Sequence, residues 1–278
     1  MTSHSAGSSG TLFADGPTGR LAYRDSGPTD GAVLVFVHGV NMASPVWDPL
    51  IAALPGFRCI AFDLRGHGMS GRRGPFTVLD YAADLDAVLR AARVERAQLV
   101  CVSLGGIIGC AYAQRSPERV HSVVAFGSAL RATHPGIDAG MARLREVGTA
   151  KYFGWSLPRG SLPANATPDV TQTVISLAVT GREDTAMVEE ITRAAFDMDP
   201  SKISLGPSGR PVLVVTGNLD TTCPPEAGRL LAATVGGNWR LVIGGGHVLP
   251  LEQPETCAQL VARFYQEPER GGTGASAS

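Results

Sequence analysis

Ser103 lies in a pattern that can present a nucleophile. It follows an apolar run at 98–102 and precedes Leu104, two glycines and a second apolar run. A serine on the sharp turn between a buried strand and a helix is exposed, provided that the residues two positions away on either side are small. Gly105 meets this condition, whereas Cys101 is larger than glycine and predicts a slightly wider crossing. The pattern predicts either a nucleophile or a serine that only caps a helix.

A nucleophilic serine needs a general base, and the base needs a carboxylate to orient it. His247 is the best candidate base, because it follows an apolar run at 240–243 and three glycines. Asp220 is the best candidate carboxylate and follows the run at 212–216. All three candidates leave the carboxyl ends of predicted strands, in the order Ser, Asp, His. We therefore expect them at one edge of a sheet.

The other histidines and acids fit the chemistry less well. His38 ends an apolar strand and His67 lies in a glycine-containing turn, so both are predicted to be structural. His134, just before a proline, is a candidate pocket residue. The run at 123–126 leads into Gly-Ser-Ala without a carboxylate, so Asp220 has no competitor there. Glu252 is predicted to be a surface or helix-entry residue.

Short apolar runs rich in β-branched residues recur along the chain and suit strands buried on both faces of a parallel sheet. Helical periodicity lies between them, at 78–92, 225–235 and 254–266. This alternation predicts a doubly wound, mostly parallel α/β sheet. The predicted strands are 32–37, 58–62, 98–102, 123–126, 212–215 and 240–243.

A segment at 131–205 has helical patterns but no strand run, and it is rich in Met and aromatic residues. We predict a helical cap over the carboxyl edge of the sheet, where open α/β folds bind ligands. The alternative is a helical excursion packed beside the sheet. The core is then expected at 11–130 and 206–268, with disordered tails at 1–10 and 269–278.

Composition excludes several classes of protein. The chain has 24 basic and 25 acidic residues, for a net charge of −1. This balance argues against a nucleic-acid groove or an anionic membrane surface as partner. No apolar run approaches the roughly 20 residues of a membrane span, and the first ten residues do not resemble a signal peptide. Nothing in the sequence indicates an oligomeric state.

The five cysteines are scattered and contain no CxxC pair, which argues against zinc and a disulfide framework. A reduced, cytoplasmic protein is the expectation. The structural interpretation is also favoured for Cys101 and Cys223, since neither has a cationic neighbour in sequence.

Five motifs in order resemble those of the α/β-hydrolase superfamily, over about residues 20–266. They are Phe-Val-His-Gly at 36–39, Asp-Leu-Arg-Gly-His-Gly-Met-Ser at 63–70, the Ser103 turn, Gly-Asn-Leu-Asp at 217–220 and Gly-His at 246–247. The pattern looks most like the small-molecule hydrolases of the enol-lactonase, esterase and C–C-bond hydrolase type. Serine at the turn argues against haloalkane dehalogenases and epoxide hydrolases, which carry aspartate there.

The resemblance implies an α/β-hydrolase fold with the cap inserted after the sixth strand. It also implies that the backbone N–H of Val40 joins that of Leu104 in an oxyanion hole. Ser103 would then form an acyl-enzyme, with no metal or organic cofactor. Asn41, Trp47 and Trp155 join His134 as candidate pocket residues, although a core role is equally compatible with Trp47.

The cap segment contains eight basic and nine acidic residues. This balance, with its Met and aromatic content, favours a small, neutral or weakly charged, partly apolar ester or lactone. Two alternatives remain. One is a non-hydrolytic lyase, cyclase or cofactor-free haloperoxidase or perhydrolase on the same scaffold, because fold does not fix function. The other, a ligand-binding receptor, has no need of a Ser-Asp-His set.

Overall fold

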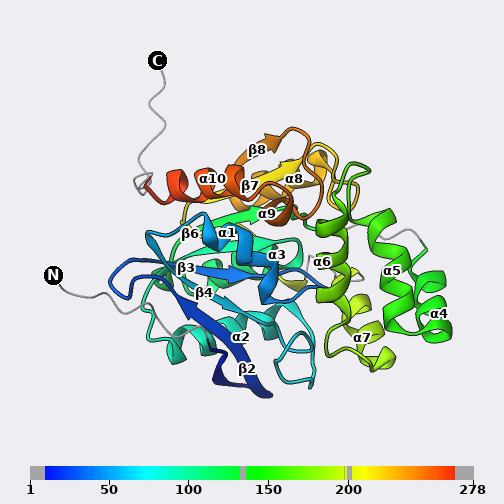
Figure 1. Ribbon diagram of the computed structural model, residues 1–278. Coiled ribbons are helices and arrows are strands. Elements are labelled where there is room, and N and C mark those ends of the chain that lie inside the picture. Colours follow the sequence, from blue (N-terminus) through cyan, green and yellow to red (C-terminus); the bar gives the residue numbers. More distant parts are fainter. Residues whose placement is uncertain (1–9, 132–135, 197, 199–201, 267–278) are drawn as a thin grey trace.

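A twisted sheet of eight strands forms the centre of the computed structural model, which describes residues 10–131, 136–196, 198 and 202–266 (Figure 1). The strand order is β1-β2-β4-β3-β5-β6-β7-β8. Strands β3 to β8 are parallel, whereas β1 and β2 form an antiparallel hairpin that pairs with β4. The strands are Leu12–Gly16, Gly19–Ser26, Ala32–Val37, Phe57–Phe62, Ala97–Val102, Val120–Phe126, Val212–Gly217 and Asn238–Val242.

The six predicted strand runs form β3 to β8, which confirms the doubly wound, mostly parallel α/β fold. Every residue of β5 and β7 is buried, as expected for strands covered on both faces. The hairpin β1–β2 was not predicted. It lies at the edge of the sheet, where Leu12 and Phe13 are exposed, so it lacks a continuous buried run.

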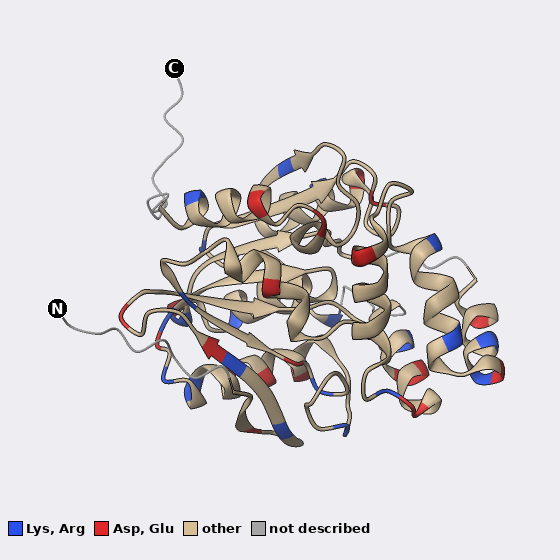
Figure 2. Cartoon of the chain, in the orientation of Figure 1, with Lys and Arg blue, Asp and Glu red and all other residues tan. Residues whose placement is uncertain are grey.

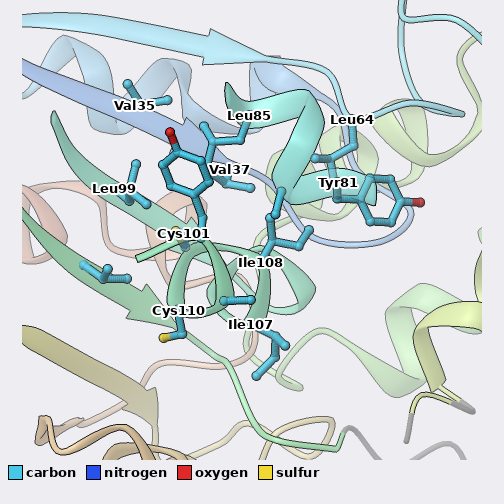
Figure 3. Close-up of a cluster of buried hydrophobic side chains, with 14 of the residues drawn as sticks. Val35, Val37, Leu64, Tyr81, Leu85, Leu99, Cys101, Ile107, Ile108 and Cys110 are labelled. Atoms are coloured by element: carbon cyan, nitrogen blue, oxygen red, sulfur yellow. The ribbon is translucent and has the colours of Figure 1, made fainter. Parts of the chain in front are cut away.

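Alternate residues of the strands supply two cores, one on each face of the sheet. Val35 and Val37 of β3 face helices α2, α3 and α8, in the cluster of which Figure 3 shows a part. Leu34 and Phe36 face the opposite way, toward α1, α9 and α10. This is the period of two that a strand requires.

The helices of the core agree with the predicted periodicity. The segments predicted at 225–235 and 254–266 form α8 and α10. Helix α2 begins at a capping box: Thr77 accepts from the Asp80 N–H, and the Asp80 carboxylate accepts from the Thr77 N–H. The core helices are α1 Asp48–Ala52, α2 Val78–Ala91, α3 Leu104–Arg115, α8 Pro225–Val235, α9 Leu249–Glu252 and α10 Pro254–Gln266, with 3₁₀ turns η1 Ser44–Trp47 and η2 Pro117–Arg119.

Four helices between β6 and β7 gather at one end of the sheet (Figure 1). They are α4 Ile137–Val147, α5 Thr149–Gly160, α6 Pro168–Val179 and α7 Thr185–Phe196. Ile191 of α7 packs on Gly66 after β4, and Thr222 after β7 donates to the Gly160 carbonyl at 2.8 Å. These helices therefore lie over the carboxyl ends of the parallel strands. The predicted tails fall almost wholly outside the described residues.

Candidate active site

Ser103 occupies a strained turn between β5 and α3. Its φ and ψ are 54° and −124°, a conformation that residues other than glycine rarely adopt. The next two glycines permit close packing, because a Cβ on Gly105 would lie 2.1 Å from the Val37 carbonyl oxygen and one on Gly106 2.2 Å from Ser128 Oγ. This tight strand-to-helix turn has the backbone geometry of a nucleophile elbow.

Cys101, which replaces the usual first glycine of the elbow, is accommodated by a glycine in the helix. A Cβ on Gly109 of α3 would lie 2.7 Å from Cys101 Sγ. The cysteine is fully buried, and burial raises the pKa of its thiol. Cys101 is therefore a packing residue of the β5–α3 crossing.

His247 and Asp220 form a buried pair. His247 Nδ1 lies 2.9 Å from Asp220 Oδ2 and donates to it, because an ionised carboxylate can only accept. The other oxygen, Oδ1, accepts from the N–H groups of Thr222 at 2.9 Å and Cys223 at 2.8 Å. Asp220 therefore fixes the tautomer of His247 and leaves Nε2 as the nitrogen that can take up a proton.

Glu252 clamps the loop that carries His247. Its carboxylate accepts from the Gly246 N–H at 2.6 Å and from the Val248 N–H at 2.8 Å, the residues on either side of the histidine. Burial acts to lower the pKa of His247, but the charges of Asp220 and Glu252 outweigh it and the pKa is raised. Glu252, for which the sequence suggested a surface or helix-entry position, is the half-buried last residue of α9 and holds this loop. Its spacing of five residues from His247 was the only available signal.

The loop after β6 brings the serine and the histidine pair to one place. Gly127 has a φ of +49°, and a Cβ there would lie 2.5 Å from the His247 carbonyl oxygen and 3.2 Å from Asp220 Oδ2. The adjacent Ser128 Oγ lies 2.9 Å from the carbonyl oxygen of Ser103, to which it donates. Ser103, Asp220 and His247 therefore gather at the carboxyl edge of β5, β7 and β8, as expected.

A small cavity opens at Ser103. Its volume is about 20 Å³, which is room for about one water molecule. Both predicted oxyanion residues flank the serine there, and Gly39 is so close that a Cβ on it would lie 2.7 Å from Ser103 Cβ. The described lining is mostly apolar: Val40, Ser103, Leu104, Ile107, Ala129, Ala195, Phe196, Met198 and Cys223.

The structure places three of the four candidate pocket residues. Trp47 is fully buried in the core and packs on Phe36 at a ring-centroid distance of 5.3 Å, so it is a core residue. Trp155 is 44 % exposed on α5, beside two arginines, and does not line the described cavity. Asn41 is buried next to Val40 and accepts from Arg182. His134 lies outside the described residues.

His38 and His67 hold the loops around the site. His38 Nε2 accepts from the Leu64 N–H at 3.0 Å, and His67 Nε2 accepts from the Asn41 N–H at 3.3 Å. Each Nδ1 therefore carries the proton and donates to a backbone carbonyl. Burial lowers the pKa of both rings, so both are neutral.

Within the described ranges, no three His, Cys, Asp or Glu side chains are grouped so that they could hold a metal ion. None of the helices described is both long and apolar enough to cross a membrane.

Comparison with known proteins agrees with the fold and the motifs. Residues 32–155 match the family model described as "alpha/beta hydrolase fold". The chain is 24 % identical over 252 residues to 3-oxoadipate enol-lactonase 1 of Acinetobacter baylyi, covering 88 % of this chain and 93 % of that one. It is 29 % identical over 272 residues to a putative non-heme bromoperoxidase of Mycobacterium tuberculosis, covering 88 % and 97 %.

Among solved structures, the chain resembles a hydrolase from Pseudomonas aeruginosa PA01 with a TM-score of 0.78 and 26 % identity. That match covers 92 % of this chain and 98 % of the other. The chain therefore has the α/β-hydrolase fold and is similar to enzymes of that superfamily over most of its length.

Proposed function

We propose that the protein is a serine hydrolase that cleaves an ester or lactone of a small, partly apolar molecule through an acyl-enzyme on Ser103. The observation that carries the proposal is the strained turn at Ser103, which shares one sheet edge with the buried His247–Asp220 pair. Strain of this kind persists only where the surrounding structure enforces it, and it is common at catalytic residues.

The first half of the reaction is acylation. His247 Nε2 takes the proton from Ser103 Oγ while the oxygen attacks the carbonyl carbon of the substrate. Asp220 stabilises the imidazolium that forms. The oxyanion of the tetrahedral intermediate accepts from the N–H groups of Val40 and Leu104, each worth about 3–4 kcal/mol in comparable sites. The imidazolium then gives its proton to the leaving oxygen.

The second half is hydrolysis of the acyl-enzyme. Water gives a proton to His247 as it attacks the acyl carbon, and the acid is released when Ser103 recovers its proton. The mostly apolar lining, which includes Ile107 and Met198, favours an apolar portion of the substrate next to the reacting carbonyl. The likeness to an enol-lactonase supports a lactone or simple ester as the substrate.

Labelling and turnover together test the proposal. We expect an activated fluorophosphonate to modify Ser103, located by mass spectrometry of peptides, and Ser103→Ala to lose both labelling and p-nitrophenyl acetate hydrolysis. Ser116→Ala, at the other end of α3, is the matched control and should retain both. Equal turnover by wild type and Ser103→Ala would refute the proposal.

The similarity to a putative bromoperoxidase favours one alternative, transfer of the acyl group to hydrogen peroxide instead of water. Both reactions use the same acyl-enzyme, so labelling of Ser103 does not separate them. Turnover of the ester with and without peroxide does. We expect water to be the preferred acceptor; faster formation of peracid than of acid would assign the perhydrolase reaction.

A further inference from the structure

Arg182 is a buried cation whose hydrogen-bonding capacity is mostly unused. It lies between α6 and α7 and is fully shielded from solvent. Nη1 donates to Asn41 Oδ1 at 2.8 Å and, at 3.4 Å, to the Ala178 carbonyl. Within the part of the chain that the structure describes, Nε and Nη2 have no hydrogen-bond partner and no carboxylate forms an ion pair with the group.

A second buried arginine, Arg65, has hydrogen-bond partners for its guanidinium and an ion pair. Arg65 is paired with Asp84 by two hydrogen bonds of 2.6 Å and also donates to the carbonyls of Pro75 and Asp80. Among the residues that the structure describes, an acid partner is therefore supplied for one buried guanidinium and not for the other. Removing one partner of a buried ion pair is strongly destabilising, so an uncompensated Arg182 is retained at a cost to stability.

Arg182 is positively charged at neutral pH, and its surroundings compensate this charge only weakly. Burial lowers its pKa, but only to about 10, so the group stays protonated. The ring of Phe153 lies 5.7 Å from the guanidinium carbon, near the limit for a cation–π contact. The nearby rings of His38 and His67 are neutral and use their Nε2 atoms elsewhere. A bound anion would supply the charge partner that the described residues do not.

Tyr81 is a second unpartnered donor in the same region. Its hydroxyl is buried and has no hydrogen-bond partner among the described residues, and Arg182 is the charge that acts on it most strongly. Figure 3 shows the hydroxyl directed away from the other labelled side chains of the core cluster. A guanidinium and a phenol, both with free N–H or O–H groups, match the oxygens of a carboxylate.

Arg182 also lies close to the reacting centre. Its hydrogen-bond partner Asn41 directly follows Val40, which lines the same cavity as Ser103. The Cα atoms of consecutive residues are about 3.8 Å apart, so Asn41 lies next to this cavity. Asn41 has a φ of 60°, and because a guanidinium cannot accept, the amide oxygen must face Arg182. A carboxylate on the substrate could therefore reach Arg182 while its ester lies at Ser103.

We propose that Arg182 and Tyr81 bind a carboxylate of the substrate, so that the preferred ester or lactone carries an anionic group a few atoms from the carbonyl that Ser103 attacks. This inference rests on the proposed function and names its substrate class. It narrows the expectation of a neutral or weakly charged substrate, which followed from the nearly even charge and the Met and aromatic content of the 131–205 segment. Since Arg182 is shielded, binding requires the α6–α7 turn to move away from Asn41.

Two esters that differ only in charge test the proposal. p-Nitrophenyl butyrate is neutral, and mono-p-nitrophenyl succinate has the same acyl length with a terminal carboxylate. We expect wild type to favour the succinate ester by at least tenfold in kcat/KM. Arg182→Met should lower kcat/KM for that ester by about 10- to 100-fold, the range expected for hydrogen bonds to a charged group, and change that of the butyrate less than threefold.

Two further variants serve as a second test and as a control. Tyr81→Phe removes only the hydroxyl and should lower kcat/KM for the succinate ester by about threefold to tenfold. Arg159→Met removes a cap charge that donates to the Trp155 carbonyl and lies over the Trp155 ring among the described residues, and should leave the preference unchanged. Circular dichroism verifies that each variant folds; should Arg182→Met not fold, wild type and Tyr81→Phe still decide.

The proposal is overturned if wild type shows no preference for the succinate ester, or if Arg182→Met or Tyr81→Phe slows both esters by the same factor. The second result would mean that these residues only support Asn41 and the loop. Neither result affects the proposed function, which is judged separately by Ser103 labelling and by hydrolysis of the neutral ester.

Discussion

At the scale of single residues, His247 is held by two carboxylates with different tasks. Asp220 contacts the ring and fixes its tautomer, whereas Glu252 contacts the backbone on both sides of the ring. Both negative charges also favour the protonated ring, so the position and the basicity of His247 are set together. A change at Glu252 is therefore expected to alter both.

Glu252→Gln separates these effects by pH. In the proposed mechanism His247 acts as a base only when neutral, so kcat/KM falls as pH drops through its pKa, which is raised above the usual 6.5. Removing the Glu252 charge lowers that pKa, so we expect the acid limb of the pH profile to move to lower pH. The plateau should also fall, since each carboxylate oxygen accepts from one N–H and the NH2 group of glutamine would take the place of one of these acceptors.

The matched control for Glu252→Gln is Glu255→Gln, an exposed residue in the first turn of α10. We expect its pH profile to be that of wild type. An acid limb of Glu252→Gln that stays in place or moves to higher pH would show that the carboxylate does not act on His247.

Gly127 offers a steric test of the same pair. Its φ is positive and a Cβ on it would lie only 2.5 Å from the His247 carbonyl oxygen, so there is no room for a side chain. Gly127→Ala should displace His247 and Asp220 and lower kcat about 100-fold, the effect of a displacement near 1 Å. Gly154→Ala on α5, where a Cβ meets nothing, should keep wild-type kcat. Equal kcat values in the two variants would contradict this geometry.

At the scale of elements, the crossing of β5 and α3 keeps its close packing although its first glycine is absent. Cys101 occupies the position where the elbow usually has its first glycine. The space for its side chain is provided by Gly109, which lies one helical turn beyond Gly105 and Gly106. Cys101 and Gly109 thus form a volume-compensated pair across the crossing. Their coupling can be measured, because each residue can be replaced separately and together.

Gly109→Ala should destabilise the protein by about 1 kcal/mol, since overpacking a core costs about 1–3 kcal/mol and alanine in a helix interior returns about 0.5–1 kcal/mol. In the background of Cys101→Gly the same substitution should be stabilising, because the sulfur it meets is gone. Urea unfolding of the four proteins gives the interaction energy of the cycle. An interaction energy near zero would mean that the two residues do not compete for space.

The success of sequence-based prediction also depended on the element. Strands β3 to β7 were predictable because both faces are largely buried, which leaves long apolar runs, whereas β8 is mostly exposed at the sheet edge and was found from a short run. The hairpin β1–β2 was missed because exposed side chains interrupt its pattern. Ser103, Asp220 and His247 could be proposed from their order after strands, whereas Glu252 and Arg182 could not. Their tasks depend on partners, the His247 loop and Asn41, that only the folded chain brings to them.

At the scale of the whole molecule, charge is distributed without a dominant sign. Figure 2 shows basic and acidic residues interspersed over the sheet domain and the helices α4 to α7. The net charge of −1 therefore gives no general attraction for an anionic substrate. Any preference for an anionic substrate must therefore come from a local group. The proposed role of the buried Arg182 is for this reason a better guide to substrate charge than the overall charge of its segment.

The cysteines provide a test of the whole fold. All five lie in the described part of the chain, are buried and are free of disulfides. Burial raises the pKa of each thiol, to about 12 for Cys59 and Cys110, so none is a reactive thiolate at neutral pH. Stability consequently should not depend on reductant.

We therefore expect dithionitrobenzoate to find almost no fast-reacting thiol in the native protein and five in denaturant. Cys223 is the exception to watch, because it lines the cavity at Ser103. If one thiol reacts slowly in the native state, Cys223→Ala should remove that reaction and prior fluorophosphonate labelling of Ser103 should slow it. A thiol count below five in denaturant would contradict the absence of disulfides, and rapid native labelling of Cys101 would contradict the buried crossing of β5 and α3 on which the elbow depends.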